Sequence, residues 1–348
     1  MPRAPIAERL TAQGLAGEPL RSPEAVAERL LAVQGQDPRG ARLAIRARTS
    51  GVSAADVDRA LSEERSLLIT WLNRGTLHLV RSEDYPWLQA LTTPPLKTSS
   101  ARRLRQEGVS PDEAERGVKT IARALADEGP LTRLQLRERL DRAGVPTAGQ
   151  ALIHLLFLVA VRGIAVRGPM SGREHAYVLV RDWLGEQKPV DREKALAELA
   201  RRYLVGHAPA DDRDLARWAG LPLRDARVGL EAISSQLSER GDGLVGLAKG
   251  AEPAPIPPPR LLGAFDPLLL GWTSREEVVG PHKVLVTTNG IFRPFALVGG
   301  RAVATWRLRG RKVTIEHLGK VSKKDAAALG ADAERVLEFL GGAQRSNL

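Results

Sequence analysis

The chain has 348 residues, of which 43% are hydrophobic, and its 52 Lys and Arg exceed its 41 Asp and Glu to give a formal charge of +11. This length predicts more than one domain, and the hydrophobic fraction excludes a disordered polycation. The absence of cysteine excludes a disulfide scaffold, a thiol nucleophile and any cysteine-bound metal or iron–sulfur cluster. No apolar run of about 18 residues occurs, and the N-terminus has no signal-peptide core, so we expect a soluble, cytoplasmic protein without membrane contact.

The basic surplus gathers in three segments. Residues 39–55 and 97–105 hold no acidic residue, and residues 293–324 hold nine basic residues against the single acid Glu316. A GC-rich genome also favours Arg, but that bias would scatter the cations among acids, so the clustering favours a nucleic-acid partner. The residues that we expect to contact DNA are Arg39, Arg42, Arg46, Arg48, Arg74, Lys97, Arg102, Arg103, Arg293, Arg307, Arg309 and Arg311.

The clearest folding unit covers residues 111–182. Apolar residues at helical spacing predict three helices, which begin near Pro111, Thr132 and Thr147. Two strand-like runs, residues 164–166 and 177–180, follow on either side of a turn rich in Gly, Pro and Ser. Three helices followed by a hairpin are typical of a winged helix.

The same pattern recurs on both sides of this unit. In residues 191–249, Asp211 is placed to cap the second of three helices. Near the N-terminus, residues 67–80 predict a hairpin that turns at Asn73-Arg74-Gly75. We therefore expect three tandem winged-helix units, which occupy residues 1–95, 96–187 and 188–250.

The C-terminal part has a different periodicity. Five prolines within residues 253–259 favour a stiff, extended linker. Beyond it, four strand-like runs, separated by turn dipeptides such as Asn289-Gly290, predict a meander that residues 261–270 close into a small barrel. The predicted fold class is therefore α+β: three tandem winged-helix units, followed by a domain over residues 260–348 that consists of a small antiparallel β-barrel and a C-terminal helix.

Most enzyme signatures are missing from the sequence. It has no GxxxxGK phosphate loop, no GxSxG nucleophile elbow and no HExxH zinc motif. The six histidines are scattered without the spacing of metal ligands, and no Lys lies in a context that suggests a Schiff base. We therefore expect neither a metal nor an organic cofactor.

Three local features contain polar residues that are candidates for a catalytic site. Gln34 and Gln36 precede Asp37-Pro38, where the end of a helix is predicted, and by composition alone a polar helix terminus is the favoured explanation for them. Thr76 and His78 share one face of a predicted strand, which is also the pattern of an ordinary solvated hairpin. Asp266, between Phe265 and Pro267, is more typical of a turn than of a catalytic acid.

Four segments together resemble a known family of enzymes. They are VQGQDPRGARLAIRAR, WLNRGTLHLV, LLGAFDPLLLGW and NGIFRPFALVGGRAVATWR, and they are similar to the tandem winged-helix DNA glycosylases, typified by the bacterial enzyme of azinomycin self-resistance. The resemblance covers nearly the whole chain and implies a DNA-binding channel formed by three winged-helix units and a β-barrel. It also implies base-excision repair of N7-alkylated purines, including bulky adducts and, in some members, interstrand crosslinks.

The resemblance assigns roles to the first two features. The family's catalytic motif is Gln–aliphatic–Gln, or Gln–x–Asp in a sister branch, and Gln34 and Gln36 match the first form. Gly35 departs from the aliphatic middle residue, which loosens the backbone. Thr76 and His78 match the family pattern and would support the site beside the DNA. Asp37 is the alternative catalytic carboxylate, since its charge could stabilise a cationic sugar.

These residues suggest a mechanism and leave alternatives. Alkylation at N7 makes the purine a good leaving group, so two amides can position a water for attack at C1′ without a strong base. We expect a monofunctional, monomeric glycosylase that acts on double-stranded DNA in the nucleoid and, given the aromatic fraction of 4%, hydrolyses bulky lesions with little base flipping. The alternatives are a winged-helix transcriptional regulator and a non-catalytic DNA-binding protein.

Overall fold

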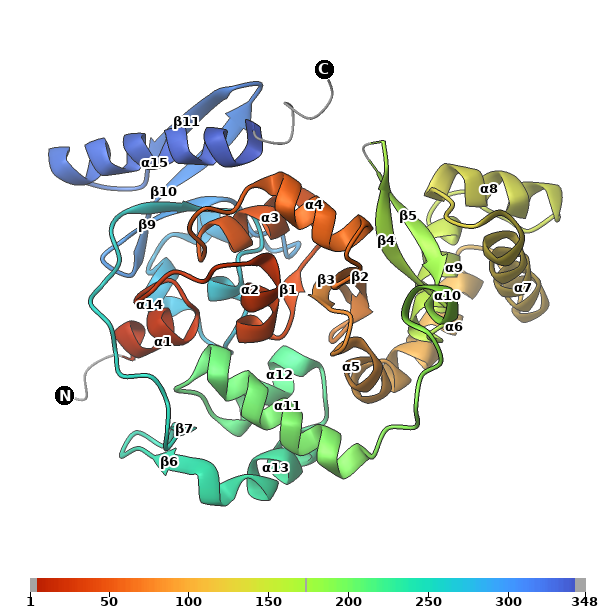
Figure 1. Cartoon of the computed structure of the whole chain (residues 1–348), viewed down its shortest axis with the longest axis horizontal. Helices are drawn as coiled ribbons and strands as arrows, with labels where there is room; N and C mark the ends of the chain where they lie inside the picture. The colour runs from red at the N-terminus through yellow and green to blue at the C-terminus, as the bar shows by residue number, and fades with distance from the viewer. Residues whose placement is uncertain (1–4, 173, 342–348) are drawn as a thin grey trace. The chain divides into compact units, whose positions relative to one another are not determined.

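A computed structural model describes residues 5–172 and 174–341 of the chain (Figure 1). The chain forms two compact units, and we describe each by itself. Unit 1 combines Met1–Val57 with Leu196–Leu348, and unit 2 is the intervening segment Asp58–Ala195. Two helices, α4 (Ala54–Ser62) and α11 (Arg192–His207), contain the points where the chain passes from one unit to the other.

Unit 2 combines helices with antiparallel strands. Its elements are β2 (Leu67–Leu72), β3 (Thr76–Arg81), α5 (Tyr85–Thr92), α6 (Pro94–Gln106), α7 (Pro111–Glu128), α8 (Arg133–Arg142), α9 (Ala151–Val161), β4 (Ala165–Ser171), β5 (Glu174–Leu179) and α10 (Val180–Leu184). The strands lie in the order β3-β2-β4-β5. The predicted first hairpin is confirmed, because β2 and β3 pair with Thr70 opposite His78. Asn73 and Gly75 have φ values of 43° and 79°, as a tight hairpin turn requires.

Two of the three helices α7, α8 and α9 begin at a capping residue. Ser110 caps α7 and Thr132 caps α8, each in a capping box that satisfies the first free backbone N–H groups. The apolar helix α9 begins at Ala151, four residues later than predicted, and Leu155 on it is buried. An added Cβ on Gly117 of α7 would lie 3.0 Å from Leu155 Cδ2, so these two helices pack closely.

Unit 1 draws on both ends of the chain. Its N-terminal elements are α1 (Ile6–Ala12), α2 (Pro23–Leu30), β1 (Val33–Gln34) and α3 (Pro38–Arg46). After α11 come α12 (Asp212–Ala219), α13 (Leu223–Ala232), β6 (Leu237–Glu239) and β7 (Val245–Leu247). Asp211 caps α12 as predicted. Because β6 and β7 pair antiparallel, the predicted succession of three helices and a hairpin is present here too.

The C-terminal sheet of unit 1 corrects one prediction. It consists of β8 (Arg260–Leu262), β9 (Phe295–Val298), β10 (Arg301–Arg309) and β11 (Lys312–His317). Helix α14 (Glu276–Val279) lies between β8 and β9 in the chain, and α15 (Lys323–Gly341) follows β11. The order β11-β10-β9-β8 is open, so the predicted closed barrel is wrong for the part of the chain that the structure describes. Residues 283–285 form a 3-10 turn where a strand was expected, and β8 has only three residues. Four such strands are too few to close a barrel.

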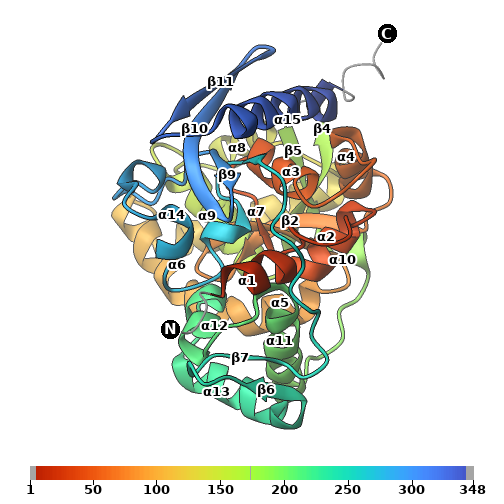
Figure 2. The ribbon, with the colours of Figure 1, turned by 90° about the vertical axis from the view of Figure 1, so that its left-hand side faces the viewer.

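The remaining segments connect these elements. Residues 251–259 have no regular secondary structure, in agreement with an extended linker. Figure 2 shows β10 continuing into the hairpin that it forms with β11, with α15 alongside. The mixed class of helices and strands is confirmed. The number of winged-helix units and the domain boundaries at residues 95, 187 and 250 stay predictions. Residues 1–4 and 342–348, which belong to the first and last predicted domains, lie outside the described residues.

Hydropathy gives one further result. Among residues 5–172 and 174–341, no helix is both long enough and apolar enough to cross a membrane.

Candidate functional site

The Gln34–Gln36 motif lies before a helix and not at the end of one. Helix α2 ends at Leu30, and Leu31 follows with a φ of 63°. The chain then passes through β1 and starts α3 at Pro38. Proline suits the first turn of a helix because its missing N–H has no partner to lose there. The prediction of a helix end was therefore wrong: Pro38 begins the next helix.

The two amides differ in exposure. Gln34 is 6% exposed, and its Oε1 has no hydrogen-bond partner among the described residues. Gln36, two residues further on, is exposed. A buried carbonyl oxygen without a partner costs free energy comparable to a lost hydrogen bond. Gln34 therefore offers an acceptor that a water or a ligand would satisfy.

Asp37 has a structural task next to this motif. Its Oδ1 accepts hydrogen bonds of 2.9 Å from the backbone N–H groups of Arg39 and Gly40 and so caps α3. Capping satisfies two of the first free donors of the helix. The arrangement explains why an acid follows the two amides, and it makes the catalytic alternative for Asp37 less favourable.

Helix α3 is held against residues 261–267 by two glycines. A Cβ on Gly40 would lie 2.3 Å from the carbonyl oxygen of Ala264, and one on Gly263 would lie 3.0 Å from Gly40 Cα. Only residues without a side chain permit this approach of two backbones. The segment LLGAFDP therefore supports the helix that follows the Gln34–Gln36 motif.

A buried ion pair anchors the other end of α3. The Arg48 guanidinium donates to both oxygens of Asp266 at 2.9 and 3.0 Å, and neither side chain is exposed. Arg48 also donates to the backbone and side-chain oxygens of Gln13. Gln13 in turn donates to Gly206 O at 2.7 Å. Asp266 caps a short 3-10 turn as the sequence suggested, but its main role is to neutralise Arg48.

The first basic segment is mostly internal, which corrects the prediction for three of its residues. Arg48 is fully buried, Arg46 is paired with Asp332 at 2.6 Å, and Arg42 is 8% exposed and donates to Pro38 O. Side chains that are this deeply buried and already hydrogen-bonded are not available to DNA phosphates. Of the four predicted here, only Arg39 is exposed.

In unit 2, His78 is also buried instead of solvated. Both faces of β3 are covered, so His78 is 3% exposed, and its Nδ1 lies 2.9 Å from Thr76 O. Because a carbonyl only accepts, Nδ1 carries the proton. Burial, with a smaller effect of Arg74, lowers the pKa of His78 to about 3. The imidazole is therefore neutral at physiological pH and does not act as a cationic acid.

Buried polar atoms without partners cluster on this hairpin. Within residues 5–172 and 174–341, no hydrogen bond satisfies the hydroxyls of Thr70 and Thr76 or either side-chain atom of Asn73. Native proteins leave few such groups, so a cluster indicates a place for water or a ligand. The sequence suggested Asn73 only as a turn residue, because its burial depends on the tertiary fold.

The other predicted DNA contacts are on the surface. Arg307 is exposed but pairs with Glu316 at 2.7 Å. The exposed cations on the β2–β3 turn, on α6 and around the C-terminal sheet are Arg74, Lys97, Arg102, Arg103, Arg293, Arg307, Arg309 and Arg311. Among the described residues, no three His, Asp or Glu come together as a metal-ligand set.

Comparison with known proteins identifies the class of protein to which this fold and its amide motif belong. The model of a family described as DNA glycosylase AlkZ-like matches residues 27–339. The interstrand DNA cross-link repair glycosylase of Streptomyces sahachiroi is 29% identical in an alignment 349 positions long, which covers 93% of this chain and 93% of that protein. The solved structure of the DNA glycosylase AlkZ of S. sahachiroi superposes with a TM-score of 0.79 at 24% identity, covering 96% of this chain and 95% of that one.

These matches define an enzyme that cleaves the N-glycosidic bonds of DNA. The chain belongs to the AlkZ-like DNA glycosylase family, because the family model covers most of its length.

Proposed function

We propose that the chain hydrolyses the N-glycosidic bond of N7-alkylated purines in double-stranded DNA and leaves an abasic site. The likeness to a named cross-link repair glycosylase supports bulky and crosslinked adducts as substrates. The exposed cations on α6 and near the C-terminal sheet support binding to the phosphate backbone. The proposal also includes tandem winged-helix units, a monomer and a place of action beside the chromosome in the cytoplasm.

An N7-alkylated purine is a good leaving group, so the enzyme needs no strong acid or base. An alkyl group on N7 gives the purine a positive charge, which disappears when the C1′–N9 bond breaks and its electron pair moves to N9. A water oxygen then forms the new bond to C1′ and loses a proton to solvent. The sugar passes through an oxocarbenium-like state, as in other glycoside hydrolyses.

The observation that carries the proposal is the unsatisfied carbonyl of Gln34. Its Oε1 is buried without a hydrogen-bond partner among the described residues, and a carboxamide oxygen can hold and orient a water. Gln36 follows on the exposed side of the motif, where its amide can bind the sugar–phosphate backbone. In this scheme the water is the nucleophile, and no lysine forms a Schiff base, so the enzyme is monofunctional.

The other candidate residues, each in its own unit, fit a mechanism of positioning. Asp37 caps α3 through Oδ1, and His78 is neutral because burial lowers its pKa to about 3. Neither group has to carry a proton in the reaction. A site of neutral hydrogen-bonding groups suits a leaving group that is already charged.

The direct test is base release from defined duplexes. Purified protein is incubated with duplex DNA that carries one N7-methylguanine, and a second aliquot of the products is treated with alkali. We expect free N7-methylguanine before alkali and strand cleavage at the lesion only after it. Retarded but intact DNA would instead support the non-catalytic binder, and preference for one undamaged sequence would support the regulator.

A further inference from the structure

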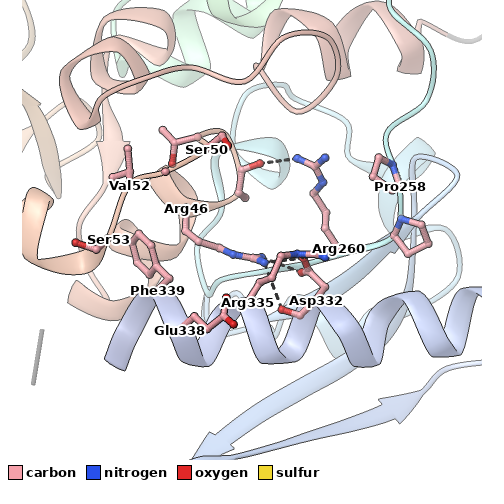
Figure 3. A pocket seen from close by; sticks show the side chains of 14 residues that line it. Arg46, Ser50, Val52, Ser53, Pro258, Arg260, Asp332, Arg335, Glu338 and Phe339 are labelled. Atoms are coloured by element: carbon pink, nitrogen blue, oxygen red, sulfur yellow. Dashed lines mark hydrogen bonds and ion pairs between the residues drawn. The ribbon is translucent and has the colours of Figure 1, made fainter. Parts of the chain in front are cut away.

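A cavity of about 600 Å³ lies in unit 1 at the end of α3 that is farthest from the Gln34–Gln36 motif (Figure 3). The loop after α3, the start of β8 and helix α15 form its walls. Ser50 and Glu338 line the cavity and are exposed, so it is accessible from solvent. The cavity is separate from the amides to which we assign the hydrolysis.

Two guanidiniums share one buried carboxylate in this cavity. Arg46 donates to both oxygens of Asp332 at 2.6 and 2.8 Å, and Arg335 donates to Oδ1 at 3.0 Å. The backbone N–H of Leu261 donates to Oδ2 at 2.7 Å. Both oxygens of Asp332 therefore accept hydrogen bonds already; Figure 3 shows those from Arg46 and Arg335. A third guanidinium, that of Arg260, lies in the same cavity and donates no hydrogen bond to this carboxylate.

Arg260 is the cation that lacks an anion. Its side chain donates to the neutral carbonyl of Ala47 at 2.5 Å, and no carboxylate pairs with it within residues 5–172 and 174–341. Burial lowers the pKa of Arg260 to about 10; the negative charge of Asp332 opposes this shift, and the nearby Arg46, Arg48 and Arg335 add to it. A half-buried charge without a counter-charge is unfavourable. The cavity therefore presents an unsatisfied positive charge.

The geometry points to a pocket in which Arg260, with Arg335 and the hydroxyl of Ser50, binds a phosphate group of the DNA backbone beside the damaged nucleotide. Guanidinium groups match phosphate oxygens in shape and charge. Glu338, the second acid in the cavity, limits the affinity so that the enzyme can release its product. This assignment rests on the proposed function, because it takes DNA as the ligand.

The length of α3 favours the DNA backbone as the source of this phosphate. A nine-residue helix is about 13 Å long, which is the rise of about four base pairs at roughly 3.4 Å each. A duplex that places its damaged nucleotide at Gln34 and Gln36 thus has flanking phosphates within reach of the cavity. Both ends of α3 belong to unit 1, so this spacing does not depend on unit 2.

Two matched pairs of variants test the pocket in the full-length protein. Glu338→Gln removes a charge inside the cavity, and Glu334→Gln removes the same charge one turn away on α15, outside the lining. Ser50→Asp adds a charge at the cavity, and Ser50→Asn is its neutral counterpart. Within the described part of the chain these side chains form no ion pair or hydrogen bond, so the variants should fold.

The measurements are the dissociation constant of an undamaged duplex at several salt concentrations and the shift in Tm with inorganic phosphate. We expect Glu338→Gln to bind duplex several-fold tighter than Glu334→Gln, and Ser50→Asp about tenfold weaker than Ser50→Asn, with a salt slope smaller by about 0.9. Equal duplex affinities within both pairs would overturn the assignment. A phosphate-dependent Tm shift that Ser50→Asp abolishes, with equal duplex affinities, would overturn DNA as the ligand.

Base release from N7-methylguanine DNA is measured separately on the wild type. Because the pocket is tested by binding to undamaged duplex, failure of the proposed glycosylase reaction and failure of the phosphate assignment give different results.

Discussion

Arg48 and Asp266 form an ion pair of 2.9 Å in which neither side chain is exposed. The pair joins the end of α3 to the segment that contacts Gly40, and it extends through Gln13 to Gly206 on α11. A buried charge that loses its partner is strongly destabilising. The pair therefore couples the stability of unit 1 to the position of the Gln34–Gln36 motif.

Replacement of Arg48 should destabilise the protein severely. We expect Arg48→Met to lower the free energy of unfolding by about 3–5 kcal/mol, because Asp266 stays buried without a counter-charge. Urea denaturation followed by circular dichroism measures the change. Arg48→Met combined with Asp266→Leu should lose less than the sum of the single changes. The exposed Arg123→Gln serves as control, and an Arg48→Met variant as stable as this control would contradict the role of the pair.

A methyl group at Gly40 should separate α3 from residues 261–267. The added Cβ would lie 2.3 Å from Ala264 O, so Gly40→Ala should cost about 1–3 kcal/mol of stability through overpacking. Gly330→Ala is the matched control, because Gly330 also lies in a helix and no atom lies within 4 Å of its Cβ position. That variant should be stabilised by about 1 kcal/mol. If thermal unfolding shows the same change for both, the close contact does not constrain α3.

The two amides should matter mainly for hydrolysis, and Gln34 should matter little for binding to undamaged DNA. We expect Gln34→Ala and Gln36→Ala each to slow single-turnover release of N7-methylguanine by about 100-fold, because each removes an oriented hydrogen-bonding group. Gln36→Glu loses the N–H donor and adds a negative charge that phosphate repels, so it should be no more active than Gln36→Ala. The exposed Gln187→Ala controls for the loss of an amide elsewhere. Full activity in the Gln34→Ala/Gln36→Ala double variant would refute the assignment.

Acid should destabilise the protein through His78. Its folded-state pKa of about 3 lies below the ordinary value near 6.5, so the unfolded chain takes up a proton that the folded chain does not. Protonation of His78 in the unfolded chain therefore lowers the free energy of unfolding. The loss is absent above pH 7, grows as the pH falls from 6.5 towards 3, and reaches about 2 kcal/mol at pH 5. Urea denaturation at pH 7 and pH 5 measures it.

The His78→Gln variant provides the comparison. It should lose less stability between pH 7 and pH 5 than the wild type does, whereas His317→Gln, at an exposed position, should behave like the wild type. An unchanged pH dependence in His78→Gln would show that His78 is not the group that titrates on unfolding.

Local signals in the sequence predicted the elements that depend on neighbouring residues. The turn at Asn73-Arg74-Gly75 and the cap at Asp211 follow from residues within one turn of the chain, and both are present. The local signal failed at Asp37-Pro38, because the same dipeptide can end one helix or cap the next. Only the position of α3 decides between these two outcomes.

The sequence by itself determined the α+β class, the helices and turns, the basic surplus and, through its motifs, the family resemblance. Tertiary structure decided which charges are available: it buried Arg48 against Asp266, paired Arg46 with Asp332, and placed Arg260 in a cavity where its guanidinium donates to a backbone carbonyl. The sequence of a segment gives its net charge. Whether Arg46 and Arg48 are buried and paired depends on partners more than 200 residues away in the chain. Those partners exist only once the fold has formed.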